Sequence, residues 1–212
     1  MSTLTKKDFL SVVRERHSVR QYDPSVKISR EEMQEMLTEA TSAPSSSNLQ
    51  PWRFLVIDDQ ALKEKLYPIA NNQAQVLDAS AVIAVLGDME WYDKAEDIYT
   101  QSQEAGYMPE EVKQKMIATA NQVYRHLDDS KKRSIVDIDS GLISMQLMLI
   151  AREKGYDTVP MGGFNHEKFK EAFNLPANYE SIMLIAIGKA AQPARQTVRL
   201  PLNQVAFWNE IN

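Results

Sequence analysis

Three short, uninterrupted apolar runs set the strongest limit on how this chain can fold. They are rich in β-branched residues and cover residues 54–57, 81–86 and 182–187. Apolar runs of this length without polar alternation are typical of strands that are buried on both faces. Segments with helical spacing of apolar residues separate the runs. We therefore expect the three runs to form the core of one sheet with helices around it.

Helix-start signals precede two of these segments near the beginning of the chain. Residues 5–8 have the form of a capping box, so we expect a helix from about Thr5 to just before Arg16. Ser29, with a glutamate three residues later, predicts a second helix that Pro44 ends.

A more apolar helix is expected at residues 141–151, with Asp139 and Ser140 as its cap and Gly155 as its stop. A segment this short is a buried core helix, because a membrane span needs about 18 or more apolar residues. The first ten residues are polar and lack the form of a secretory signal. These features predict a cytoplasmic protein without a membrane partner.

The 212 residues contain no clear linker or repeat, so we expect a single domain over residues 1–212. Within it, a polar helical excursion is predicted at about 88–133, where Pro109 starts a helix. The end of the chain carries Val205, Phe207 and Trp208. This tail is too apolar to stay in water, and we expect it to dock on another surface.

Composition excludes several functions. The chain has no cysteine, so disulfides, thiolate metal sites and thiol nucleophiles are absent. Its net charge of -5 argues against non-specific nucleic-acid binding. The glycines do not form a dinucleotide-binding or P-loop motif, and the histidines His17, His126 and His166 lack metal-ligand spacing. No metal is therefore expected, and His126 is predicted to be a surface residue.

Arg16, Ser18 and Arg20 alternate along the chain directly after the first predicted helix. If this segment is extended, its alternation points all three side chains to one side. Two guanidiniums and a hydroxyl suit a phosphate, which accepts several charge-assisted hydrogen bonds. A solvated helix end, with cations near the negative end of the helix dipole, explains the same residues equally well when they are considered alone.

Two loops add the features expected around a flat ligand. Residues 44–48 place three serines and an amide after a proline, which favours a rigid loop with free backbone N–H groups. Residues 159–164 place Gly162 and Gly163 after a short strand, where missing side chains allow close approach to the backbone. A simple turn is the alternative for the glycines. Asn72 could offer an amide to a heterocycle, although an exposed loop asparagine is common.

Taken in order, the segments RHSVR, APSSSNLQPW, LDAS, VPMGGF and VRLP resemble the FMN-dependent nitroreductase family, from about residue 9 to about residue 202. The resemblance implies an α+β fold, with a central mixed and mainly antiparallel sheet flanked by helices. It also implies an intertwined homodimer with two FMN sites at the interface, each built from both subunits. Residues at about 192–212 would then form an arm that embraces the partner.

The same resemblance assigns the cofactor-binding residues by motif. The FMN phosphate and ribityl chain would be held by Arg16, Ser18 and Arg20, with Arg199 from the C-terminal segment and His17 at a backbone contact. The flavin would be covered by five residues of the partner chain: Pro44, Ser45, Ser46, Ser47 and Asn48. Asn72 would meet the pyrimidine edge of the ring. The ring near N5 would be lined by Pro160, Met161, Gly162 and Gly163.

The implied activity is an NAD(P)H-dependent reductase that works by a ping-pong cycle through flavin N5. A small molecule such as a nitroaromatic or quinone would be the acceptor, and no side chain is assigned as catalytic because the flavin carries the redox chemistry. Gly162 and Thr197 depart from members that carry a glutamate and a lysine there. A dehalogenase, an enoate-type reductase and a non-catalytic FMN-binding sensor remain as alternatives.

Overall fold

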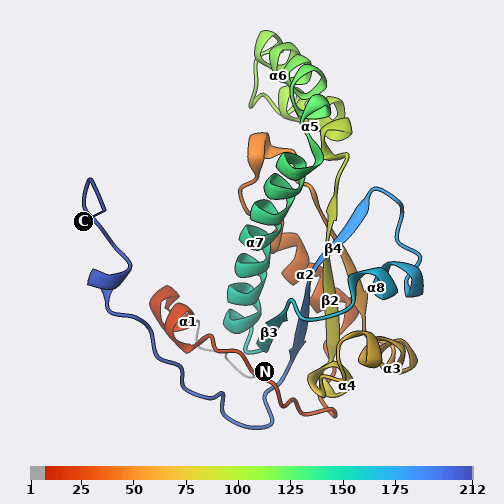
Figure 1. Cartoon of the computed structure of the whole chain (residues 1–212), viewed down its shortest axis with the longest axis vertical. Coiled ribbons are helices and arrows are strands. Elements are labelled where there is room, and N and C mark those ends of the chain that lie inside the picture. Colours follow the sequence, from red (N-terminus) through yellow and green to blue (C-terminus); the bar gives the residue numbers. More distant parts are fainter. Residues whose placement is uncertain (1–7, 212) are drawn as a thin grey trace.

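A computed structural model describes residues 8–211, and a four-stranded sheet forms its centre. The strands are β1 (Trp52–Ile57), β2 (Ala81–Asp88), β3 (Asp157–Met161) and β4 (Tyr179–Gly188). They lie in the order β1-β2-β4-β3, and all three pairings are antiparallel (Figure 1). A single bridge between Ser18 and Thr158 adds a parallel contact at the β3 edge. The expected α+β fold with a mainly antiparallel sheet is confirmed.

The three predicted strands fall within β1, β2 and β4. β2 lies inside the sheet with helices on both faces and is buried along its whole length. β4 is also an inner strand, but Ile182 and Met183 are half-buried, so the expected full burial holds only for the later part of that run. β1 is an edge strand whose middle is half-buried, so full burial was a wrong expectation for it. β3 was expected only as a short strand before the two glycines.

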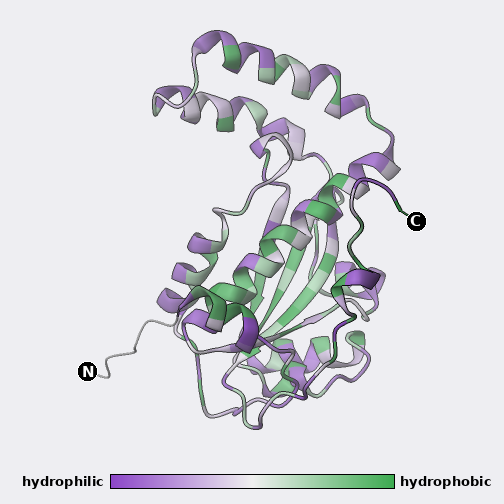
Figure 2. Ribbon diagram, turned by 90° about the vertical axis from the view of Figure 1, so that its left-hand side faces the viewer, coloured by the Kyte–Doolittle hydropathy of each residue, from purple (hydrophilic) through white to green (hydrophobic). Residues whose placement is uncertain are grey.

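Alternating residues of the inner strands divide the core into two layers. Ile83 and Val85 of β2 face α2 (Arg30–Ala40) and α7 (Asp129–Glu153). Val82 and Ala84 face the opposite layer, which contains α3 (Gln60–Ile69), α4 (Gln75–Asp78) and α8 (His166–Ala172). Figure 2 shows apolar residues gathered where α7 lies along the sheet. Helices on both faces explain why β2 carries no polar alternation until its last residue.

The first two helices begin close to their predicted starts. α1 spans Phe9–Glu15, and Asp8 caps it by accepting hydrogen bonds from the N–H groups of Leu10 and Ser11. The predicted start at Thr5 lies outside the described residues. Ser29 caps α2 as expected, but α2 ends at Ala40, before the proline at position 44.

The start predicted for the central helix is wrong. α7 begins at Asp129, is capped by Asp128 and continues through Gly141. The first turns of α7 are polar because they extend beyond the sheet, so the apolar run marks only the packed half of the helix. Its stop is as expected: Gly155 follows the helix with a φ of 85°, which suits glycine.

At 25 residues, α7 is also long and apolar enough to cross a membrane by length and composition. The sequence predicted only residues 141–151 as this helix, and the additional length comes from the polar turns that precede them. In the structure, 44% of the apolar window of α7 is buried inside the protein, and the helix contacts all four strands. A core helix passes the same test, so this feature is weak evidence for a membrane span.

Residues 91–126 form helices that project beyond the end of the sheet (Figure 1). They are η2 (Trp91–Lys94), α5 (Ala95–Glu104), α6 (Glu110–Gln122) and η3 (Tyr124–His126). Pro109 precedes α6 as predicted, and His126 is exposed. Trp91 and Tyr99 are buried in a small separate cluster with Val136 of α7. This cluster holds the projecting helices to the rest of the protein.

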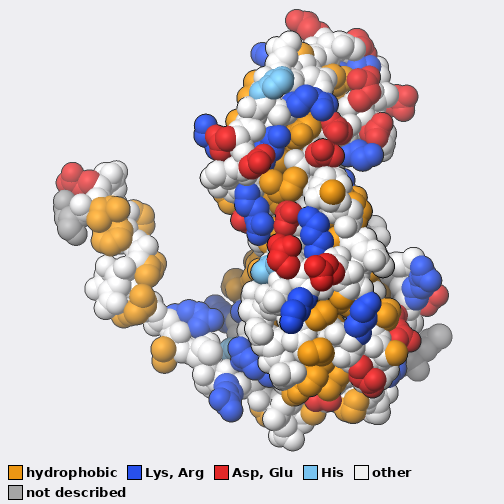
Figure 3. All heavy atoms as spheres, turned by 45° about the vertical axis from the view of Figure 1, so that its right-hand side comes forward, with side chains coloured by type: hydrophobic (Ala, Val, Ile, Leu, Met, Phe, Trp, Pro, Cys, Tyr) orange, Lys and Arg blue, Asp and Glu red, His pale blue; other side chains and the backbone are white. Residues whose placement is uncertain are grey.

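The C-terminal segment after β4 is extended apart from one short turn, η4 (Leu202–Gln204). It reaches away from the body and carries hydrophobic side chains (Figure 3). Trp208 is 82% exposed, and Val198 and Leu202 are also exposed. The segment therefore buries little of its apolar surface within one chain.

Candidate functional site

Residues 16–20 leave α1 in an extended conformation beside β3. Arg16 already has extended backbone angles, and the N–H of Val19 donates to the carbonyl of Thr158 at 3.1 Å. Val19 is buried in the core, whereas Arg16 and Ser18 are half-buried and Arg20 is exposed. The predicted extended segment is thus present, with Val19 turned inward between the polar residues.

A hollow of about 280 Å³ lies beside this segment. Ser18 and Arg20 line it together with Arg195, which the sequence did not single out. The predicted partner, Arg199, is not among the lining residues; its Nη1 donates to Thr197 Oγ1 at 2.8 Å in the exposed tail. Within one chain, Arg195 therefore supplies the additional cation. His17 lines a neighbouring cavity of about 550 Å³.

The arginines of this segment have no ion-pair partner in the described part of the chain. Among residues 8–211, neither Arg16 nor Arg20 takes part in an ion pair. The Nε of Arg16 is buried and has no hydrogen-bond partner in the described part of the protein. Buried donors are normally paired, so an unpaired guanidinium nitrogen fits a site that an anion completes.

The glycine turn, Gly162 and Gly163, begins where β3 ends, four residues after Thr158, which forms the bridge to Ser18. A Cβ added at Gly162 would meet nothing within 4 Å, and one at Gly163 would meet only the side-chain nitrogen of Asn71 at 3.9 Å. Neither glycine has a positive φ. Neither close packing nor a left-handed backbone therefore requires glycine here. The space above the turn is open and could admit a ligand.

Side-chain amides hold this turn in place. The carbonyl of Gly163 accepts hydrogen bonds from Asn71 Nδ2 at 2.8 Å and Gln73 Nε2 at 3.1 Å. Gln75 is buried and contacts both Gln73 and the sulfur of Met161. Asn72, the residue predicted from the sequence, is exposed, whereas its neighbours make these contacts. Four amide residues within positions 71–75 were the available signal.

Residues 44–48, which we call the serine loop, lie in a different part of the chain's fold. The short helix η1 (Ser46–Asn48) forms within it. We expected free backbone N–H groups in this loop, but two of them are hydrogen-bonded. The N–H of Ser46 donates to Asp139, and the N–H of Asn48 donates to the carbonyl of Ser45 at 3.0 Å. The hydroxyl of Ser45 accepts from the N–H of Gln50. The loop thus uses its own polar groups to fix its shape.

One chain keeps the two parts of the predicted site apart. The serine loop contacts α7 at Asp139, whereas Arg152 of α7 pairs with Asp157 at the start of β3. These two α7 residues are 13 positions apart (152 minus 139), which corresponds to roughly 20 Å along a helix. Residues 16–20 and the glycine turn are therefore brought together by β3, but the serine loop is not.

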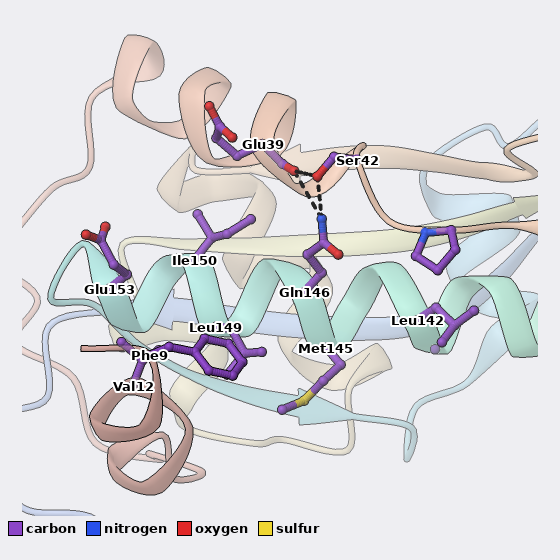
Figure 4. A pocket seen from close by; sticks show the side chains of 12 residues that line it. Phe9, Val12, Glu39, Ser42, Leu142, Met145, Gln146, Leu149, Ile150 and Glu153 are labelled. Atoms are coloured by element: carbon purple, nitrogen blue, oxygen red, sulfur yellow. Dashed lines mark hydrogen bonds between the residues drawn. The ribbon is translucent and has the colours of Figure 1, made fainter. Parts of the chain in front are cut away.

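A groove runs along the exposed face of α7 between these two parts (Figure 4). It has a volume of about 750 Å³ and is bordered by α1, α2 and α7. Leu142, Met145 and Leu149 project from α7 toward it, and Phe9 lies across from them. Figure 4 also shows Gln146 donating to Ser42 Oγ, a contact of 2.7 Å that closes one side of the groove.

The family model described as Nitroreductase matches residues 13–189 of the chain. The chain belongs to the nitroreductase family. The region matched by the nitroreductase model includes residues 16–20, the serine loop and the glycine turn. It leaves out Arg195 and Arg199.

Relatives in this family match nearly the whole chain. The YdgI protein of Bacillus subtilis, provisionally named an NAD(P)H nitroreductase, is 51% identical over 203 residues, covering 95% of this chain and 97% of the relative. The CLA biosynthesis enone reductase from Lactiplantibacillus plantarum is 37% identical over 202 residues, covering 94% of this chain and 93% of the relative. The chain is therefore an oxidoreductase of the nitroreductase family.

A solved structure shows the same fold. The crystal structure of a provisionally named nitroreductase from Exiguobacterium sibiricum, in complex with FMN, has a TM-score of 0.93 and 48% sequence identity, and the match covers 98% of this chain and 100% of that one. This likeness extends through both parts of the candidate site and through the projecting helices.

Proposed function

We propose that this protein is an FMN-dependent oxidoreductase that uses NADH or NADPH to reduce a small organic acceptor, such as a nitroaromatic or a quinone. The flavin would supply the redox chemistry, taking up hydride at N5 and passing it on in a ping-pong cycle. The observation that carries the proposal is that Arg16 and Arg20 have no ion-pair partner among residues 8–211, while the strand β3 next to them ends in an open glycine turn. The FMN-bound relative supports it.

The residues of one chain would hold FMN at two places. Arg16, Ser18 and Arg20 would bind the phosphate and ribityl chain, with Arg195 or Arg199 as a further cation and His17 at a backbone contact. Pro160, Met161, Gly162 and Gly163 would line the ring, and Asn72 would meet its pyrimidine edge. The backbone N–H groups of Gly162 and Gly163 would stabilise the negative charge of the reduced ring.

A second copy of the chain would complete the site. The serine loop contacts α7 at Asp139, roughly 20 Å along the helix from Arg152, which pairs with Asp157 beside residues 16–20, so we expect the loop of one chain not to cover the ring that its own arginines anchor. If two copies pack through the exposed faces of α7 in antiparallel directions, the serine loop of each reaches the arginines of the other. The apolar groove on α7 and the exposed tail residues support this homodimer. A single domain, with a helical excursion at 88–133 and an arm at 192–212, and a cytoplasmic location stay predictions.

The redox proposal is tested by an anaerobic visible spectrum of the FMN-loaded protein. NADH or NADPH should bleach the flavin absorbance, and a nitroaromatic or quinone added afterwards should restore it. A flavin that neither nicotinamide bleaches would identify a non-catalytic FMN-binding protein instead.

Enone reduction is a second candidate, favoured by the whole-length likeness to the enone reductase. It predicts that an α,β-unsaturated ketone reoxidises the reduced protein faster than a nitroaromatic does. Parallel single-turnover measurements with the two acceptors separate these activities.

Deleting residues from 205 onward should loosen the dimer. Phe207 and Trp208 are exposed in one chain, and we expect a partner subunit to bury their aromatic area. Sedimentation at decreasing protein concentration should show the truncated protein dissociating at a concentration where the full chain is still dimeric. A truncated protein with the dissociation constant of the full chain would remove the role of the arm.

A further inference from the structure

The serine loop and the residues after it adopt a backbone conformation that L-residues rarely take. Ser47, Asn48 and Gln50 have positive φ angles of 52°, 55° and 48°. Asparagine tolerates this region better than serine and glutamine do. Such conformations persist only where the surrounding structure holds them. The contacts on either side of Ser47 therefore decide whether the loop keeps its shape.

Asp139 of α7 holds the start of the loop. Its Oδ2 accepts a hydrogen bond from the N–H of Ser46 at 3.0 Å, and its Oδ1 accepts one from the Ser46 hydroxyl at 3.2 Å. Ser45, the residue before η1, makes no side-chain cap bond to the helix. Asp139 thus satisfies the first N–H of η1 from a distant point in the sequence, as an N-cap residue would.

The carboxylate of Asp139 is unusual for its surroundings. Asp139 is 2% exposed, and within the described part of the chain no cation pairs with it. Burial raises its pKa, and the two bonds from Ser46 oppose that rise. Burying an acidic group without a countercharge costs free energy. The described partners of Asp139 are the two donors of Ser46, so we infer that binding Ser46 is its role.

Two tyrosines hold the other side of the loop. The hydroxyl of Tyr99 in α5 donates to the carbonyl of Ser47 at 2.8 Å, and the hydroxyls of Tyr124 and Ser47 share a hydrogen bond of 2.6 Å. Tyr99 is buried, so its hydroxyl position is fixed by packing. The left-handed turn at Ser47 is therefore held between α7 on one side and the projecting helices on the other.

We propose that Asp139 is the positioning residue of the serine loop, which it fixes through Ser46 in the shape that covers the flavin of the partner subunit. The covering role rests on the function proposed above; the fixing of the loop does not. The three serine hydroxyls then serve to build the loop, and contact with the flavin is left to other atoms of the loop.

The test compares Asp139→Ala with Asp139→Asn, and with Asp137→Ala as a matched control. Asp137 is an exposed acid on the same helix whose partner is Arg133. Amide hydrogen exchange is measured at Ser46 and at Ile83, a buried β2 residue, in protein without flavin. The dissociation rate of FMN is measured separately on the loaded protein.

Asp139→Ala should raise exchange at Ser46 and FMN dissociation by roughly tenfold or more, because it leaves a donor unpaired, while Ile83 stays protected. Asp139→Asn keeps an oxygen for the Ser46 N–H and should stay within about threefold of the wild type. Asp137→Ala should match the wild type in all three measurements.

The proposal would be overturned if Asp139→Ala exchanged the Ser46 amide and released FMN at the rates of the wild-type protein. It would also be overturned if Asp139→Asn raised both rates as much as Asp139→Ala does. Equal loss of protection at Ile83 and Ser46 would also overturn it, since that indicates general destabilisation. If Asp139→Ala does not fold, Ser46→Ala replaces it, because this change removes the hydrogen bond from the Ser46 hydroxyl to Asp139. An unchanged amide exchange rate at residue 46 in that variant would count against the proposal. If the wild-type protein takes up no FMN, the proposed function fails but the fixing of the loop by Asp139 can still be tested, because the amide exchange measurement needs no flavin.

Discussion

Arg20→Ala should weaken FMN binding by roughly 10- to 100-fold, which corresponds to one lost charge-assisted hydrogen bond to a phosphate. Arg20 is exposed at the edge of the hollow that it shares with Ser18 and Arg195, so its removal should leave the fold intact. Equilibrium dialysis or fluorescence titration of the flavin-free protein measures the change.

Riboflavin provides the control for this prediction, because it carries the same ring and ribityl chain without the phosphate. The affinity for riboflavin should be almost the same in Arg20→Ala and the wild type. Arg30→Ala, at an exposed arginine of α2, should change neither affinity. Equal losses for FMN and riboflavin would show that Arg20 does not contact the phosphate.

Gly87→Ala should destabilise the protein by about 1–3 kcal/mol, and Gly87→Val by more, because both overpack the contact between β2 and α7. A Cβ at Gly87 would lie 2.0 Å from Cγ1 of Val136, a distance that real Cβ atoms essentially never show. Val136 is fully buried and cannot move aside without shifting α7. Urea unfolding followed by circular dichroism measures the loss.

The double variant Gly87→Ala with Val136→Ala tests the cause of this loss. Removing Cγ1 of Val136 vacates the space that the new methyl group needs, so the two changes together should cost less than the sum of the single changes. Additive losses would mean that the strain lies elsewhere. Val136 stands about one helical turn before Asp139, the residue of α7 that binds Ser46 of the serine loop.

The sequence predicted those helices and strands that are determined by residues close together in the chain. The strands at 54–57, 81–86 and 182–187 could be identified because burial between helix layers removes polar residues from the run. Ser29 was identified as a cap because its hydrogen-bond partner lies three residues away. The start of α7 could not be found in this way, since its first turns are polar and their composition continues that of the preceding helical excursion.

The candidate site followed the same rule. Residues 16–20 follow the first helix in an extended conformation, and Gly162 and Gly163 follow a short strand, as the local sequence indicated. Asp139 was mistaken for a helix cap, because its actual partner, Ser46, is 93 positions away in the sequence. Arg195 was missed for a similar reason: only the path of the chain after β4 brings it beside Ser18 and Arg20.

Titration of the flavin-free protein with FMN tests the central claim most directly, when it is combined with a measurement of mass in solution. We expect binding to saturate at one FMN per chain in a particle of two chains, with the flavin retained through gel filtration. A protein that takes up no FMN from an excess, or that binds it fully as a monomer, would contradict a phosphate-anchored flavin site built from two copies of this chain.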